Sequence, residues 1–267
     1  MQDSGYFGGM RHDPRRAMQL FLVLDGAVRL LVWTSALSLS AVATAYLVGR
    51  PPGVPYEADF GWAWRWGRHL ATWVILFNFF YVLVLIVLRL PIPKPREGRY
   101  ALDRPVRLAT PEGRQLLWSC LIAVLTKARY EAPFPAFLVY QFSVTPPLSW
   151  LMGPIFGPRS RSYNATNPCI LDPHLVSIGR NTVIGYNTTI AGHIQERDAV
   201  YIRRTVIEDD VMVGGHAVIP GGVHIGRGAM IGTGAIVLPD TVIGPNEFWA
   251  GVPARKIKDL PAVGPRA

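Results

Sequence analysis

Two stretches of the chain are apolar along their whole length and contain no charged residue. Residues 30–48 and residues 70–88 each run for 19 residues without Asp, Glu, Lys or Arg. At about 1.5 Å per residue, each would reach roughly 28 Å as a helix, close to the hydrocarbon thickness of a bilayer. Arginines flank both stretches, and tryptophans gather near the start of the second, as in the aromatic belt of a membrane interface. The pattern predicts a helical hairpin that crosses a membrane; two buried helices of a soluble core or a cleaved signal peptide are the alternatives.

The second half of the chain has a different pattern, an internal repeat of six residues. A period of six fits neither an α-helix nor a simple alternating strand, so each hexad would form a short strand and a corner. Three hexads would close one triangular coil, and residues 170–254 are enough for four to five coils stacked as a solenoid. The large apolar residues at this spacing are Ile178, Ile184 and Ile190, and then Ile207, Val213, Ile219, Ile225, Ile231, Val237, Ile243 and Trp249.

Charge is distributed unevenly between these two parts. The formal net charge is +9; residues 1–163 hold 18 Lys and Arg against 9 Asp and Glu, whereas residues 164–267 hold 9 of each. Because the basic excess accompanies the apolar stretches, it favours a lipid bilayer over nucleic acid as the partner. Two cysteines exclude a disulfide framework and a zinc site made of four cysteines. A chain that is 50% hydrophobic and only 17% charged is also too apolar to be disordered throughout.

These patterns divide the chain into four predicted parts. Residues 1–93 form an N-terminal tail and a two-helix transmembrane hairpin, residues 94–163 a membrane-adjacent connecting region, residues 164–260 a mainly β domain, and residues 261–267 a C-terminal tail. Basic residues are more numerous outside the hairpin loop than in it, so the positive-inside rule places both termini and the β domain in the cytoplasm, at the inner (plasma) membrane. The connecting region either lies at the membrane interface or packs on the next domain as an ordinary linker.

The repeat and the segment that closes it resemble a known family. The pattern Ile-Gly-x-x-Thr/Ala-x, ending in Trp-Ala-Gly-Val-Pro-Ala-Arg at residues 249–255, is similar to the hexapeptide-repeat acyltransferases. The closing segment is especially similar to the branch of galactoside, maltose and xenobiotic O-acetyltransferases, and the resemblance covers roughly residues 164–258. It implies a left-handed parallel β-helix, acetyl-CoA or another acyl-CoA as co-substrate, no metal, and a homotrimer with sites between its subunits.

The repeat is interrupted between Ile190 and Ile207. Their separation of 17 residues is one short of three hexads, which predicts a loop that projects from the coil. His193 lies in this interval, at the place where the resemblance implies the catalytic histidine. A histidine with a pKa near the working pH can take the proton of an acceptor hydroxyl and return it to the leaving thiolate. We expect Glu196 or Asp198 to orient the imidazole, and the spacing does not choose between them.

The other candidate residues lie at the corners of the repeat and at its end. His216 is a second candidate histidine, predicted to contact the substrate; an exposed corner residue is the alternative. Asn187 resembles a family position near the acceptor, with a structural corner asparagine as its alternative. An arginine beside a lysine suits phosphate recognition, although the same pair could be a solvated charge. The resemblance implies Gly215, Thr233 and Gly234 along the pantetheine arm of CoA, and Arg255 and Lys256 near its phosphates.

Together these observations predict a membrane-anchored acyltransferase with His193 as general base. It would move an acetyl or other acyl group from acyl-CoA to a hydroxyl of a lipid-linked saccharide or cell-surface polysaccharide precursor. An N-acyltransferase on the same scaffold is the main variant. Two further classes stay open: a zinc enzyme similar to the γ-class carbonic anhydrases, in which His193, His216 and His224 would meet across subunits, and a non-catalytic scaffold.

Overall fold

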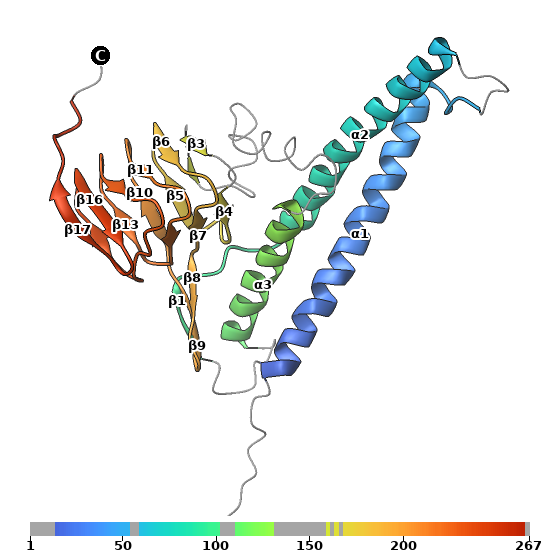
Figure 1. Ribbon diagram of the computed structural model, residues 1–267. Helices are drawn as coiled ribbons and strands as arrows, with labels where there is room; N and C mark the ends of the chain where they lie inside the picture. Colours follow the sequence, from blue (N-terminus) through green and yellow to red (C-terminus); the bar gives the residue numbers. More distant parts are fainter. Residues whose placement is uncertain are drawn as a thin grey trace, which may run out of the picture.

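The computed structural model has a helical part and a β part, which lie beside one another (Figure 1). Helices α1 (Pro14–Val48) and α2 (Phe60–Arg89) form a hairpin, and the shorter α3 (Pro111–Tyr130) runs beside them (Figure 1). Residues 1–13, residues 265–267 and most of the predicted connecting region lie outside the described residues. The described residues are 14–53, 59–101, 110–130, 159–160, 163–165 and 168–264.

The two apolar stretches lie within the two helices of the hairpin. Asp59 begins α2 as its N-cap, and its side chain accepts a hydrogen bond of 2.6 Å from the backbone N–H of Trp62. Within the described residues, Leu22–Val48 and Phe60–Arg89 are long and apolar enough to cross a membrane, by length and composition only. The side chains buried between the helices are Val32, Ala36, Phe77, Tyr81 and Leu85. Large apolar side chains that remain exposed along the two helices include Leu30, Val42, Leu47, Ile75, Phe79 and Val87.

Helix α3 packs against both helices of the hairpin. Leu125 and Ala128 belong to the same buried cluster, and the Tyr81 hydroxyl donates a hydrogen bond of 2.9 Å to the Ala128 carbonyl oxygen. The buried carboxylate of Asp25 on α1 lies 3.1 Å from Arg29 Nε and 3.4 Å from Lys127 Nζ on α3. This part of the connecting region is therefore docked on the helices rather than extended between the two parts.

The β part is a coil of short parallel strands with three faces. The first face holds β2 (Arg159–Ser160), β5 (Val176–Ile178), β10 (Thr205–Ile207), β13 (His224–Ile225) and β15 (Val242–Ile243). The second holds β3 (Tyr163–Ala165), β6 (Thr182–Ile184), β11 (Met212–Val213), β14 (Met230–Ile231) and β16 (Glu247–Gly251), and the antiparallel β17 (Ala254–Asp259) closes its edge. The third holds β4 (Cys169–Ile170), β7 (Thr189–Ile190) and β12 (Val218–Ile219).

The hexad positions stack on one another from coil to coil, as the repeat predicts. On each face the inward residue of one strand is paired with the inward residue of the next, and nearly all of them are at most 2% exposed. The β-helix expected from the sequence is therefore confirmed, whereas its left-handed winding stays an implication of the resemblance. The three stacked columns are Ile178, Ile207, Ile225 and Ile243; Ile184, Val213, Ile231 and Trp249; and Ile170, Ile190 and Ile219.

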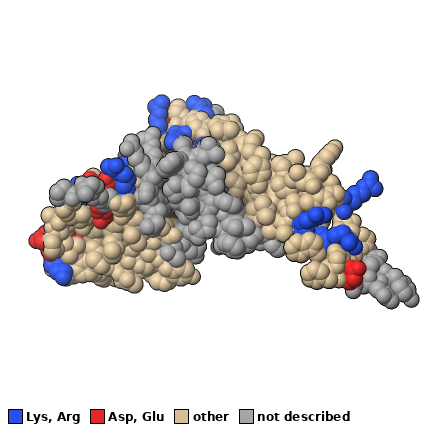
Figure 2. All heavy atoms as spheres, turned by 90° about the horizontal axis from the view of Figure 1, so that it is seen from above, with Lys and Arg blue, Asp and Glu red and all other residues tan. Residues whose placement is uncertain are grey.

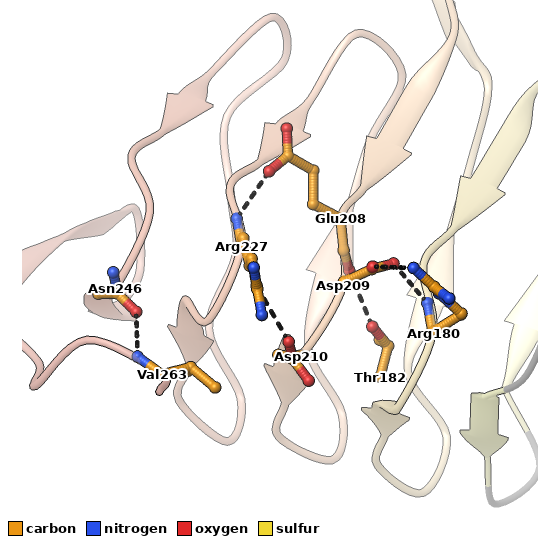
Figure 3. A network of polar contacts seen from close by, with 8 residues as sticks. All are labelled: Arg180, Thr182, Glu208, Asp209, Asp210, Arg227, Asn246 and Val263. Atoms are coloured by element: carbon orange, nitrogen blue, oxygen red, sulfur yellow. Dashed lines mark hydrogen bonds and ion pairs between the residues drawn. The ribbon is translucent and has the colours of Figure 1, made fainter. Parts of the chain in front are cut away.

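Polar side chains tie the corners of successive coils together (Figure 3). Asp209 accepts a hydrogen bond of 2.7 Å from the Arg180 backbone N–H of the preceding coil. Arg227 of the following coil donates from its backbone N–H to Glu208 at 2.8 Å and from Nε to Asp210 at 3.1 Å. These contacts satisfy backbone groups that the short strands leave unpaired, so the network favours regular stacking of the layers.

Candidate active site

The interruption of the repeat is a β-hairpin rather than an irregular loop. Strands β8 (His193–Gln195) and β9 (Ala199–Ile202) are antiparallel, and His193 is paired with Ile202 at the base of the hairpin. The other edge of β9 pairs with β1 (Gly98–Ala101), a strand from the segment that follows α2. The predicted projection is present, but its pairing with a strand about a hundred residues earlier was not predicted.

His193 forms a close hydrogen-bonded pair with a buried carboxylate. Its Nδ1 lies 2.6 Å from Asp172 Oδ2, and the same oxygen accepts a hydrogen bond of 2.9 Å from the Gly192 backbone N–H. Asp172 is 1% exposed, whereas the His193 side chain is 33% exposed. Because an ionised carboxylate only accepts hydrogen bonds, Nδ1 carries the proton and Nε2 is the basic nitrogen of the neutral ring. This is the arrangement that a general base needs.

Electrostatics favours an ionised Asp172 and a basic His193. Burial acts to raise the pKa of Asp172, but the hydrogen bond and charge of His193, together with the Gly192 N–H, hold that pKa below its usual value. The hydrogen bond that His193 donates to Asp172 raises the pKa of His193 above its ordinary value of 6.5, against the opposing effect of burial. The pair therefore acts as one unit, in which the carboxylate stabilises the imidazolium that forms when His193 takes a proton.

A second histidine, His174, lies beside the pair. Both of its ring nitrogens are buried and contact no hydrogen-bond partner within the described ranges, and the same holds for Asp172 Oδ1. The pKa of His174 is lowered to about 4, mainly by burial; Asp172 acts to raise it, and the charges of Arg89, Lys94 and His193 act to lower it. His174 is thus neutral at physiological pH. Because the charges of Arg89 and Lys94 act on the pKa of His174, the C-terminal end of α2 and the segment that follows it lie near the site.

The structure corrects the predicted partner of His193. Asp198 lies near the hairpin tip, where its Oδ2 is 2.6 Å from Arg99 Nη2 on β1, and Glu196 starts the turn, with its N–H donating to the Ala199 carbonyl. The partner is Asp172, 21 residues before His193, which the sequence reasoning missed. Ile170 is paired with Ile190, so this coil has 20 residues instead of the 18 that three hexads give. Counting in hexads therefore does not predict that Asp172 lies next to Gly192 in the neighbouring coil.

Five predicted contact residues gather at one corner between the second and third faces. The residues Asn187, His216 and Gly234 occupy the same position of successive coils, with φ of 53°, 58° and 68°. This left-handed conformation is favoured by Asn and Gly. His216 adopts it as an exposed corner residue, with its ring edge-on to the Tyr186 ring. Gly215 and Thr233 directly precede two of these positions. By contrast, His193 lies at the corner between the third and first faces.

The two predicted phosphate contacts on β17 differ in their surroundings. Lys256 Nζ lies 2.7 Å from both Glu247 Oε1 and Asp259 Oδ1, and Glu247 also accepts a hydrogen bond from the Trp249 indole. Arg255 is exposed, and its guanidinium donates to the Ala254 carbonyl at 3.2 Å. Lys256 is therefore already committed to two carboxylates, and of the two side chains Arg255 is the better placed for a phosphate.

The three histidines of the zinc alternative are separated within the chain. His193 pairs with Asp172, His216 lies against Tyr186, and His224 Nε2 lies 2.7 Å from Glu208 Oε1 on the first face. Across the described residues no group of three His, Cys, Asp or Glu is placed to hold a metal ion.

Comparison with known proteins agrees with this architecture. Residues 204–239 match the family described as bacterial transferase hexapeptide (six repeats). The chain is 35% identical over 124 residues to galactoside O-acetyltransferase of Escherichia coli K12, covering 44% of this chain and 60% of that protein. It is 44% identical over 84 residues to a 2,3,4,5-tetrahydropyridine-2,6-dicarboxylate N-acetyltransferase of Halalkalibacterium halodurans, covering 32% and 33%. The chain thus spans less than two thirds of either relative.

Among solved structures, the chain is similar to a hexapeptide-repeat acetyltransferase of Vibrio cholerae, which was crystallised with acetyl coenzyme A. The two are 20% identical with a TM-score of 0.40, and the likeness covers 59% of this chain and 94% of the other.

Proposed function

We propose that this protein is an acyl-CoA-dependent acyltransferase in which His193 is the general base and Asp172 orients it. The observation that carries the proposal is the pair itself, a partly exposed imidazole held through Nδ1 by a buried, ionised carboxylate. It is supported by the hexapeptide repeat and by relatives that are named acetyltransferases. The bound co-substrate would be acetyl-CoA or another acyl-CoA.

The chemistry follows from the position of the proton on His193. Nε2 takes the proton of an acceptor hydroxyl as its oxygen attacks the thioester carbonyl, which gives a tetrahedral intermediate and an imidazolium stabilised by Asp172. When the carbon–sulfur bond breaks, the imidazolium returns the proton to the CoA thiolate. The products are the acyl ester and free CoA, and the histidine ends in its starting form.

The placement of the candidate residues supports an oligomer. His193 lies at one corner of the β-helix, and the predicted CoA contacts Gly215, Thr233 and Gly234 lie at another, so the two groups would meet when one chain packs beside a second. An apolar column on the outer surface of the second face is suited to such packing. It consists of Val183, Met212, Met230 and Phe248, which are paired in that order. The homotrimer implied by the resemblance would complete the site in this way.

The helical hairpin supports attachment to a membrane. The helices present a broad surface without charge, and Lys and Arg gather at the end of the hairpin that is farthest from the β part (Figure 2). An apolar surface of this size on two long helices is suited to lipid. With both termini in the cytoplasm, the catalytic domain would act at the inner face of the plasma membrane, where a lipid-linked saccharide or polysaccharide precursor is the acceptor that the anchor brings within reach.

The test uses full-length protein in lipid nanodiscs with labelled acetyl-CoA and a lipid extract of the producing cells. Label should enter the glycolipid fraction with the native protein, and His193→Ala should abolish this. His224→Ala is the matched control, since it removes an imidazole paired with a carboxylate on another face and should leave transfer intact. Equal transfer by His193→Ala and the native protein would refute the proposed base. Absence of acyl-CoA binding in calorimetry would support the scaffold instead.

An amine acceptor is a second candidate, favoured by the similarity to an N-acetyltransferase. The same proton transfer by His193 would then produce an amide. Alkaline hydroxylamine distinguishes the two products, because it releases the label from an ester and leaves an amide intact.

A further inference from the structure

The strand that holds the catalytic hairpin comes from the segment directly after the predicted membrane anchor. Gly98 of β1 is paired with Ile202 on one edge of β9, and His193 of β8 is paired with the same Ile202 on the other edge. Only eight residues separate Gly98 from Arg89, the last residue of α2. A two-stranded ribbon alone is only marginally stable in water, so the third strand decides whether the hairpin keeps one conformation.

Tyr100 is the buried side chain of this strand. It is 8% exposed and packs in one apolar cluster with Leu175 and Ile202, and Leu116 of α3 lies against the same cluster. Its hydroxyl donates a hydrogen bond of 2.7 Å to the Arg96 carbonyl oxygen, which satisfies the polar end of the ring.

Leu175 and Ile202, which share the cluster with Tyr100, each lie beside one member of the proposed catalytic pair. Leu175 ends the turn that begins at Asp172, with its N–H donating to the Asp172 carbonyl at 2.9 Å. Leu175 also packs against Gly192, since a β-carbon built on that glycine would lie 2.5 Å from Leu175 Cβ. Ile202 is the strand partner of His193. One apolar cluster therefore connects the Tyr100 ring with both the turn carrying the carboxylate and the hairpin carrying the imidazole.

Polar contacts fasten the same strand at the surface. Arg99 contacts Asp198 at 2.6 Å and the Tyr201 hydroxyl at 3.2 Å, and Glu97 lies 3.3 Å from Arg204 Nε. These side chains are about half exposed, and exposed ion pairs contribute little to stability. The backbone pairing of β1 and the buried Tyr100 ring are therefore its main contributions.

We propose that β1, through Tyr100, is a positioning element of the catalytic site, so that the segment following the membrane anchor holds His193 and Asp172 in register. This inference rests on the proposed function. It makes the connection between anchor and enzyme a structural part of the active site rather than a passive tether. Tyr100 touches neither reacting atom, and it acts through Leu175 and Ile202.

The test compares Tyr100→Ala with Tyr100→Phe in the full-length protein, with Tyr46→Ala as the control for removing an exposed tyrosine from α1. Displacement of a catalytic group by about 1 Å can cost on the order of 100-fold in rate, so Tyr100→Ala should lower kcat by about 10- to 100-fold with KM for acetyl-CoA unchanged. The acid limb of the kcat/KM profile should move down towards pH 6.5 as the Asp172 contact loosens. Tyr100→Phe and Tyr46→Ala should keep native values.

Hydrogen–deuterium exchange supplies a readout that does not depend on turnover. In Tyr100→Ala, peptides from residues 193–202 should exchange faster, while those from residues 205–243 should keep native protection. Native kcat in Tyr100→Ala would overturn the proposal, as would a loss of kcat with an unmoved acid limb and faster exchange throughout the β-helix. If His193→Ala keeps full activity, the proposed function fails by itself, and the exchange data still report whether β1 holds the hairpin.

Discussion

Replacement of Asp172 by asparagine tests the charge of the proposed catalytic pair with little change in shape. The amide oxygen can still accept from Gly192 N–H, so the turn should survive, but the charge that stabilises the His193 imidazolium is lost. A hydrogen bond to a charged group contributes about 1.5–3 kcal/mol, which corresponds to roughly a 10- to 150-fold fall in kcat/KM. Because Asp172 raises the pKa of His193, its removal should also shift the acid limb of the profile to lower pH.

The assay is the release of CoA thiol from acetyl-CoA in the presence of acceptor lipid, followed between pH 5 and 9. Asp198→Asn is the matched control, since it makes the same chemical change at the other end of the hairpin, where the carboxylate faces Arg99. It should lower kcat/KM far less and leave the acid limb in place. The reasoning is refuted if Asp172→Asn retains native kcat/KM, or if Asp198→Asn has the larger effect on both quantities.

Three further predictions concern stability. The pKa of His174 is about 4 in the folded state and 6.5 in the unfolded state, so protons bind the unfolded state preferentially. The free energy of unfolding should therefore fall by about 3 kcal/mol as the pH drops from 6.5 to 4. His174→Leu should flatten this part of the curve of thermal midpoint against pH. Ile219→Ala opens a cavity at a fully buried position and should cost about 2–5 kcal/mol, measured by denaturant unfolding of the β-helix; a loss below 1 kcal/mol would contradict the stacked core. Gly185→Ala should lower the thermal midpoint, because its Cβ would lie 2.4 Å from Gly215 N, whereas Gly26→Ala in open space should not.

The parts of this fold that repeat along the chain could be predicted from the sequence. The charge-free runs lie within α1 and α2, and the hexad residues from Ile178 to Trp249 form the stacked columns of the core. The first pattern is a continuous apolar run and the second a period of six residues, and both can be recognised locally along the chain; the period persists because every coil meets an equivalent layer above and below. The break in that period predicted the projecting segment that contains His193, whereas the role proposed for this histidine came from the family resemblance.

The completion of the site was decided by tertiary structure alone. Asp172 faces His193 because one coil is two residues longer than the repeat, and Tyr100 reaches the hairpin from about a hundred residues away in the sequence. Asp198 and Glu196 are nearer to His193 along the chain, but the antiparallel pairing of β8 and β9 carries them away from its base towards the tip. A repeat fixes what each residue meets in the next layer, whereas contacts at its interruption depend on which distant segment the folded chain brings to that place.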